Sequence, residues 1–156
     1  MSEAAIDNAL AVSVREVLEK MFFLDLADPP DGTARPAGVV AEVKFEGNPP
    51  GVFRLDLDLA AARAAAADFL GQDPEELSAA ATEEVVCELA NMICGSVLSR
   101  VESSAVFRLA TPRIASTGEL AAPPEASFQA AVGEGLLRAE IRMERPVCLE
   151  TGEPAS

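Results

Sequence analysis

The stretch TEEVVCELANMICGSVLSRV, residues 82–101, decides the predicted fold because its apolar side chains recur at helical spacing. At about 100° per residue, Val86, Leu89 and Ile93 gather on one side of the helix. A helix with one apolar side buries that side against a core. The stretch therefore predicts a long helix, from near residue 82 to near residue 101, that lies on the hydrophobic core.

The opposite side of this helix carries polar residues and a glycine. Glu88, Asn91 and Gly95 lie within about 40° of Glu84 around the helix axis. Asn is a poor helix former, and a glycine in a helix interior costs roughly 1 kcal/mol relative to alanine. These residues face away from the predicted core, and Gly95 leaves the backbone there open to close approach. From spacing alone, an ordinary solvated helix face is the simpler interpretation.

The sequence before this helix predicts a first long helix, two strands and a short helix. Apolar residues recur at helical spacing from about residue 2 to residue 26, where two prolines and a glycine follow. Residues 39–45 and 53–59 alternate apolar and polar side chains on either side of the turn EGNPPG. This alternation predicts a strand pair with one solvated face. Residues 60–71 predict a short helix that Gly71 closes.

The sequence after the long helix predicts further strands. AVFRLATPRI, residues 105–114, is typical of a strand, and residues 126–143 predict two strands joined by a Gly-Glu-Gly turn. Each half of the chain thus has a long helix and antiparallel strands, which indicates an internal duplication. Aligning REVLEKMFF with CELANMICG pairs Glu16 with Glu88 and Glu19 with Asn91.

Together these elements predict an α+β fold with two long helices packed on an antiparallel sheet of about five or six strands. The 156 residues have the length of one domain, 1–156, with pseudo-repeats over about 8–60 and 80–145. We expect residues 146–156 to form a flexible tail.

The charge of the chain excludes several classes of partner. The formal net charge is −14, and the 12 basic residues form no cluster, which disfavours binding to nucleic acid or to anionic membranes. The apolar runs are interrupted well before the roughly 20 residues that a membrane span needs. We therefore expect a soluble, cytoplasmic protein.

The residue types also limit the chemistry. The chain has no histidine, which removes the Ser-His and Cys-His nucleophile pairs. Cys87, Cys94 and Cys148 are odd in number and form no CxxC pair, so neither a disulfide framework nor a zinc site is predicted. Any chemistry must come from carboxylates, from amides or from groups that a partner supplies.

Four acidic residues of the first strand pair could suggest a cation site because hard metals prefer carboxylates. They are Glu42, Glu46, Asp56 and Asp58. We favour a solvated strand face, and we predict no metal or cofactor site in the chain.

Three motifs together carry a resemblance to a known family. They are ExxNMIxG (Glu88, Asn91, Met92, Ile93 and Gly95), the upstream EVLEKMFF, and the downstream TPRIASTG with Pro112. Together they resemble the chemotaxis phosphatase family of CheC, CheX and FliY, and the single intact site is most similar to a CheX-type domain. The resemblance spans roughly residues 8 to 145.

The family signature is an Asp or Ser, three residues, a Glu, two residues, an Asn, and a Pro about twenty positions later. Glu88 and Asn91 match it, Pro112 is close to the expected spacing, and Glu84 stands where Asp or Ser is usual. The resemblance implies partner-binding roles for Glu84, Gly95 and Pro112. In the first half, Glu19 replaces the Asn, so we expect one working site per chain.

The resemblance implies hydrolysis of the aspartyl phosphate of a CheY-like receiver domain. Asn91 would hold the attacking water, and Glu88 would pair with the receiver's lysine. Mg²⁺ would be supplied by the phosphorylated receiver, and the chain would need no cofactor of its own. The family also implies a homodimer that pairs through a sheet edge.

Two other functions stay open at this point. The chain could be a non-catalytic CheX-like module that binds a receiver or another signalling protein without hydrolysis, and an assay of phosphate release separates these readings. A small-ligand-binding α/β domain would require a concave pocket with convergent polar groups, which a sequence does not reveal. The target receiver, and whether the pathway is chemotaxis, also stay open.

Overall fold

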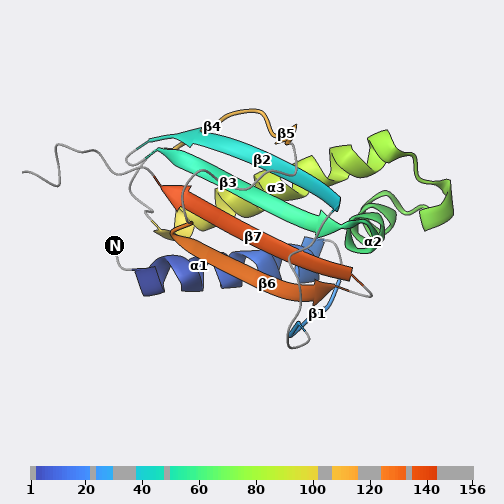
Figure 1. Cartoon of the computed structure of the whole chain (residues 1–156), viewed down its shortest axis with the longest axis horizontal. Helices are drawn as coiled ribbons and strands as arrows, with labels where there is room; N and C mark the ends of the chain where they lie inside the picture. The colour runs from blue at the N-terminus through green and yellow to red at the C-terminus, as the bar shows by residue number, and fades with distance from the viewer. Residues whose placement is uncertain are drawn as a thin grey trace, which may run out of the picture.

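A computed structural model describes residues 3–21, 24–29, 38–47, 50–101, 107–115, 124–132 and 135–143. Its centre is an antiparallel sheet, which has seven strands (Figure 1). The strands are β1 (Leu26–Ala27), β2 (Gly38–Glu46), β3 (Gly51–Asp58), β4 (Arg108–Leu109), β5 (Arg113–Ile114), β6 (Ala126–Val132) and β7 (Gly135–Met143). Their order is β1-β6-β7-β3-β2-β4, and β5 also pairs with β2.

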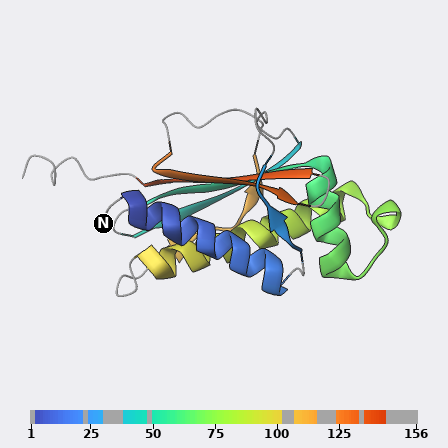
Figure 2. The ribbon, with the colours of Figure 1, turned by 90° about the horizontal axis from the view of Figure 1, so that it is seen from below.

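The helices cover one face of this sheet, as Figure 2 shows. They are α1 (Glu3–Glu16), continued by the π-helical η1 (Val17–Met21), then α2 (Leu59–Leu70), the 3-10 turn η2 (Pro74–Glu76), and α3 (Ala79–Val101). Helices α1 and α3 lie side by side across the sheet, and α2 packs near one end of it. The predicted fold class, two long helices on an antiparallel sheet, is confirmed.

The two halves meet in the middle of the sheet. Each half contributes a hairpin, β2–β3 or β6–β7, and the second strands of the two hairpins, β3 and β7, pair with each other. The helices cross over between the halves, because α1 packs over β6 and α3 packs over β2. Neither half could therefore bury its strands without the helix of the other.

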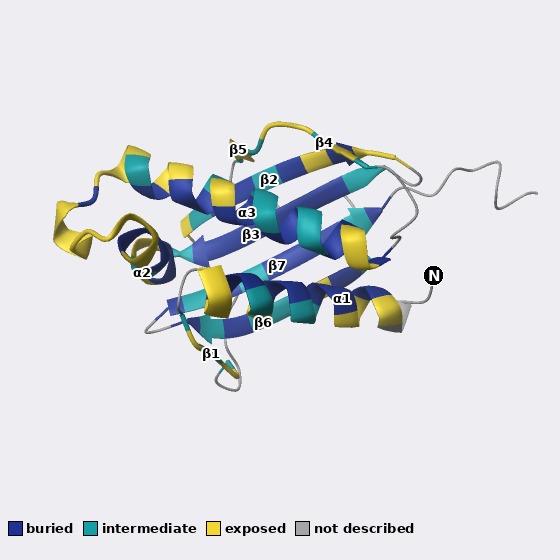
Figure 3. Ribbon diagram, turned by 180° about the vertical axis from the view of Figure 1, so that it is seen from behind, coloured by how far each residue is buried: buried dark blue, intermediate teal, exposed yellow. Residues whose placement is uncertain are grey.

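The helix that carries the predicted site is held by the sheet and by α1. Its buried residues include Leu89, Ile93 and Val97, which pack on the sheet side. Towards α1, Ser96 donates a hydrogen bond from Oγ to the buried Ser13 Oγ at 2.9 Å. Figure 3 shows the buried stripes of both long helices turned toward the sheet and their exposed residues on the outside.

Two helix ends test the predicted boundaries. In the described structure the first helix ends at Met21, earlier than predicted, with the wider π-helical turn η1. The Leu24 amide donates a hydrogen bond to the Leu18 carbonyl at 2.9 Å. The short helix ends as predicted at Gly71, whose φ of 67° is left-handed and favours glycine. The predicted tail, 146–156, lies outside the described residues.

The prediction of a solvated strand face was wrong for the middle of the sheet, whereas Lys44 and Glu46 at the end of β2 are exposed as predicted. On the side of the sheet away from the helices, Arg54, Asp56 and Glu140 are only 5%, 7% and 4% exposed. Glu42 lies beside Arg54, with 3.5 Å between carboxylate and Nε, and accepts a hydrogen bond from Arg113 at 2.9 Å. Cross-strand register places Glu42 and Glu140 on either side of Arg54, so these three charged residues lie together in the sheet rather than in solvent.

The last of the four acidic residues has a structural role. Asp58 accepts hydrogen bonds at 2.9 Å from the amides of Ala61 and Leu136, so it caps α2 and ties it to β7. No group of three side chains able to hold a metal is present in the part of the chain that the structure describes. Among those same residues, no helix combines the length and the hydropathy that a bilayer crossing requires.

Candidate functional site

The outward side of α3 carries four of the residues predicted from the sequence. Glu84 and Glu88 are exposed, and Asn91 and Gly95 are half-buried. None belongs to the buried stripe of α3. Within the described residues, no hydrogen bond or ion pair holds the side chain of Asn91 or of Glu88. Both side chains are therefore available to groups from outside the chain.

The glycine of this helix is not required by the protein's own packing. A Cβ built on Gly95 would meet nothing within 4 Å. Because a glycine in a helix interior costs roughly 1 kcal/mol relative to alanine, its presence here has no explanation in the stability of the fold. Gly95 lies one helical turn after Asn91, so the open space beside it is next to Asn91 on the helix surface.

A β-bulge places Pro112 beside the helix. Phe45 pairs with Leu109 and Ala41 pairs with Ile114, so five steps along the edge strand correspond to four along β2. The extra residue lies between β4 and β5, where the sequence had predicted one continuous strand. Pro112 has no amide hydrogen to donate to a ladder, so a bulge on an edge strand suits it.

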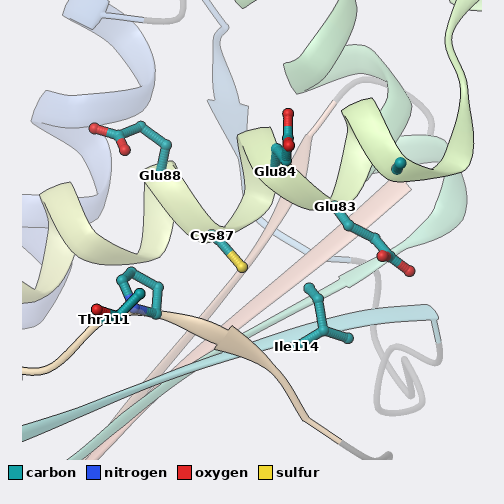
Figure 4. A pocket seen from close by; sticks show the side chains of 8 residues that line it. Glu83, Glu84, Cys87, Glu88, Thr111 and Ile114 are labelled. Carbon is teal, nitrogen blue, oxygen red and sulfur yellow. The ribbon is translucent and has the colours of Figure 1, made fainter.

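An open groove of about 430 Å³ lies between helix α3 and the edge strand formed by β4 and β5 (Figure 4). Its lining residues are Ala80, Glu83, Glu84, Cys87, Glu88, Thr111, Pro112 and Ile114. We call it the α3–β5 groove.

The groove brings together only part of the predicted site. Glu84, Glu88 and Pro112 line it, whereas Asn91 and Gly95 lie outside it, farther along the same side of α3. Sequence reasoning missed the contributions of Glu83, Thr111 and Ile114. The bulge that sets the edge strand against the helix could not be read from the strand pattern alone.

The cysteines of α3 are thiols in two different settings. Cys87 is half-buried in the groove, and its pKa is raised first by burial and then by the charges of Glu83 and Glu84. Cys94 is fully buried, which raises its pKa to about 12. Both thiols therefore stay protonated near neutral pH, and Cys148 lies outside the described residues.

The corresponding positions of the first half are occupied differently. Glu16 forms ion pairs with Arg100 at 2.6 Å and with Lys20 at 3.6 Å. The hydrogen bond and charge of Arg100, and then the charge of Lys20, lower the pKa of Glu16. Glu19, where the second half has Asn91, is exposed in the π-helical turn. The first half thus presents a paired carboxylate and no amide.

Comparisons with known proteins agree with this architecture. The family model "Chemotaxis phosphatase CheX" matches residues 39–133, more than half of the chain, and this span includes Glu88, Asn91 and Pro112. None of the curated proteins searched has a matching sequence.

Solved structures share the fold at low sequence identity. The chain is similar to the chemotaxis protein CheX of Vibrio vulnificus, with a TM-score of 0.71 and 24% identity, over 92% of this chain and 99% of that chain. It is also similar to CheX in a CheX–CheY–BeF₃–Mg²⁺ complex from Borrelia burgdorferi, with a TM-score of 0.65 and 17% identity, over 89% and 97% of the two chains. Thermotoga maritima FliY is a more distant match, with a TM-score of 0.57 and 14% identity, over 88% and 86%.

The fold, the outward Glu-Asn pair and the matched sequence span converge on one family. The chain belongs to the CheX family of chemotaxis phosphatases.

Proposed function

We propose that this chain hydrolyses the aspartyl phosphate of a CheY-like receiver domain, with Asn91 positioning the attacking water and Glu88 docking to the receiver's lysine. One observation carries the proposal: both side chains lie on the outward side of α3 without partners among the described residues. Membership in a phosphatase family supports the reaction class. The similar Borrelia protein was solved with CheY, BeF₃ and Mg²⁺, which supports a receiver as the partner.

The residues fit the chemistry of phosphoryl transfer. Water attacks the phosphorus in line, the bond from phosphorus to the receiver's aspartate oxygen breaks, and the aspartate leaves as a carboxylate while inorganic phosphate forms. An amide can accept a hydrogen bond from the water through its oxygen and donate through its nitrogen, without adding charge. Such reactions depend mainly on positioning and on charge stabilisation, so a chain without histidine can catalyse them. In this proposal the receiver supplies the Mg²⁺. The reaction takes place in the cytoplasm, where receivers are phosphorylated.

The direct test is a panel of phosphorylated CheY-like receivers from the same genome, each assayed for phosphate release with and without the chain. At least one receiver is expected to lose its phosphate much faster with catalytic amounts of the chain. If no receiver is dephosphorylated faster, but one binds in its BeF₃-activated form, the non-catalytic reading replaces this proposal.

Gly95→Ala is expected to stabilise the fold while weakening the activity. The open space at Gly95 accepts a methyl group, so the free energy of unfolding should rise by about 0.5–1 kcal/mol. The same methyl group would obstruct a receiver that approaches the helix backbone, so the KM for the receiver should rise several-fold. Urea unfolding and phosphate release measure the two effects.

Asn8→Ala is the matched control for this prediction. Asn8 is exposed on α1, and its replacement also improves helix propensity without changing charge. The control should gain stability and keep its KM. An unchanged KM in Gly95→Ala would mean that no partner approaches this part of the helix.

We also propose that the chain forms a homodimer through the free edge of β6. Strand β1 pairs only with Ala131 and Val132, so residues 126–130 leave a strand edge open among the described residues. Open edges readily pair with a second chain. Sedimentation equilibrium is expected to give about twice the mass of 16.3 kDa. A monomer mass across the accessible concentration range would contradict the dimer.

A further inference from the structure

The α3–β5 groove has two chemically different walls. Glu83 and Glu84 belong to the helix wall, and Pro112 and Ile114 form an apolar wall on the edge strand. Figure 4 shows Glu83 and Cys87 directed toward the edge strand, whereas Glu84 and Glu88 point away from it. Ile114 is 37% exposed, so part of its apolar surface is accessible to a partner. No basic side chain lines the groove in the part of the molecule that the structure describes.

We propose that this groove binds one long basic side chain, lysine or arginine, of the docked receiver. Its alkyl stem would pack against Pro112 and Ile114, and its charged head would lie beside the Glu83 carboxylate, which is directed toward the edge strand. This inference rests on the proposed function, because Glu88 lines the same groove and joins it to the catalytic side of α3.

The chemistry of the walls selects this occupant. Lysine and arginine combine an apolar stem with a charged head, which matches an apolar wall facing carboxylates. An acidic occupant would be repelled by Glu83, in a chain of net charge −14. A purely apolar occupant would bury the Glu83 carboxylate without a partner, which is costly.

The proposed cation is distinct from the lysine that docks to Glu88. Glu83 and Glu88 are five positions apart, which separates them by about 7.5 Å along the axis and by roughly 140° around it. Figure 4 shows their side chains directed to opposite sides of the helix. One ammonium group therefore cannot serve both carboxylates, and the receiver must present two separate basic residues.

Charge reversal of Glu83 tests the inference against a matched control. The probe is the receiver selected in the phosphate-release panel, activated with BeF₃ and Mg²⁺. Glu83→Lys is expected to raise the dissociation constant by about tenfold or more, because it places a cation where a cation binds. Glu75→Lys makes the same change of charge at an exposed position of η2 outside the groove, and should change the dissociation constant less than about twofold.

Alkylation of Cys87 gives a second, independent readout. Cys87 lines the groove, so saturating BeF₃-activated receiver should slow its reaction with N-ethylmaleimide by about tenfold, as measured by peptide mass spectrometry. Cys94 is the internal control, because its full burial should keep it unreactive with or without the receiver. Equal dissociation constants for the two charge reversals, or an unprotected Cys87, would overturn the inference.

The failure of this inference can be told apart from failure of the proposed function. If the native chain dephosphorylates the receiver while Glu83→Lys binds it as tightly as Glu75→Lys, only the groove assignment is wrong. If the native chain dephosphorylates no receiver but the Glu83 effect on binding persists, the groove assignment holds for a binding module.

Discussion

Replacing Asn91 with alanine is expected to lower the rate of receiver dephosphorylation by about 10²-fold or more, with little change in receiver affinity. The amide is the proposed group that holds the water in line with phosphorus, and loss of a positioning or charge-stabilising group typically costs rates of this size. The affinity should persist because Glu88 and the groove residues stay in place. Phosphate release under single-turnover conditions and binding of the BeF₃-activated receiver measure the two quantities.

The structure makes this variant informative. Asn91 is half-buried and makes no side-chain hydrogen bond within the described residues, so its truncation should change the free energy of unfolding by less than about 0.5 kcal/mol. Asn91→Asp repeats the carboxylate that Glu19 supplies in the first half, and should be as inactive as alanine because it repels the phosphoryl group. Dephosphorylation at the native rate by Asn91→Ala would remove the catalytic assignment.

Glu88 should behave differently from Asn91. Its proposed ion pair with the receiver's lysine fixes the register of docking, so Glu88→Ala should mainly raise KM. If Asn91→Ala lowers the maximal rate and Glu88→Ala weakens receiver binding, the two residues have separate roles, in positioning water and in docking. Equal effects of both variants on binding alone would favour the non-catalytic module.

The helical part of the fold was readable from the sequence because its periodicity is local. The spacing from residue 82 to residue 101 placed Leu89 and Ile93 in the core and Asn91 outside it, and α3 has this orientation. Gly71 likewise predicted the end of α2, because the left-handed conformation that ends a helix depends on a single residue and favours glycine. The end of the first helix was not readable, because nothing in EVLEKMFF distinguishes a π-helical turn from a regular one.

The sheet was predictable only in part because its chemistry depends on register between distant strands. Alternation correctly separated the apolar from the polar positions of β3, but it assigned the polar side to solvent. Arg54 is buried because Glu42 lies opposite it on β2 and Glu140 lies opposite it on β7. The groove was missed for the same reason, since the bulge beside Pro112 appears only when β4 and β5 are paired with β2.

This buried charge predicts a large effect of Arg54 on stability. Its side chain is 6% exposed and lies between two carboxylates, of which Glu42 is 12% and Glu140 is 6% exposed. Arg54→Ala removes a cation from this environment and is expected to lower the free energy of unfolding by about 3 kcal/mol or more. The value should stay near the lower end of the usual range, because Glu42 keeps Arg113 and Glu140 keeps Arg138 as partners.

Two further substitutions identify the cause of that loss. If the charge dominates, Arg54→Lys should recover much of the stability and Arg54→Met little, whereas packing of the stem alone would make methionine the better replacement. Arg63→Ala makes the same change at an exposed position of α2 and should cost less than about 0.5 kcal/mol. Urea unfolding of all four variants decides between these outcomes. Equal losses for Arg54→Ala and Arg63→Ala would mean that the ion pairs on this face contribute nothing, and that β3 is held by its helix-facing residues alone.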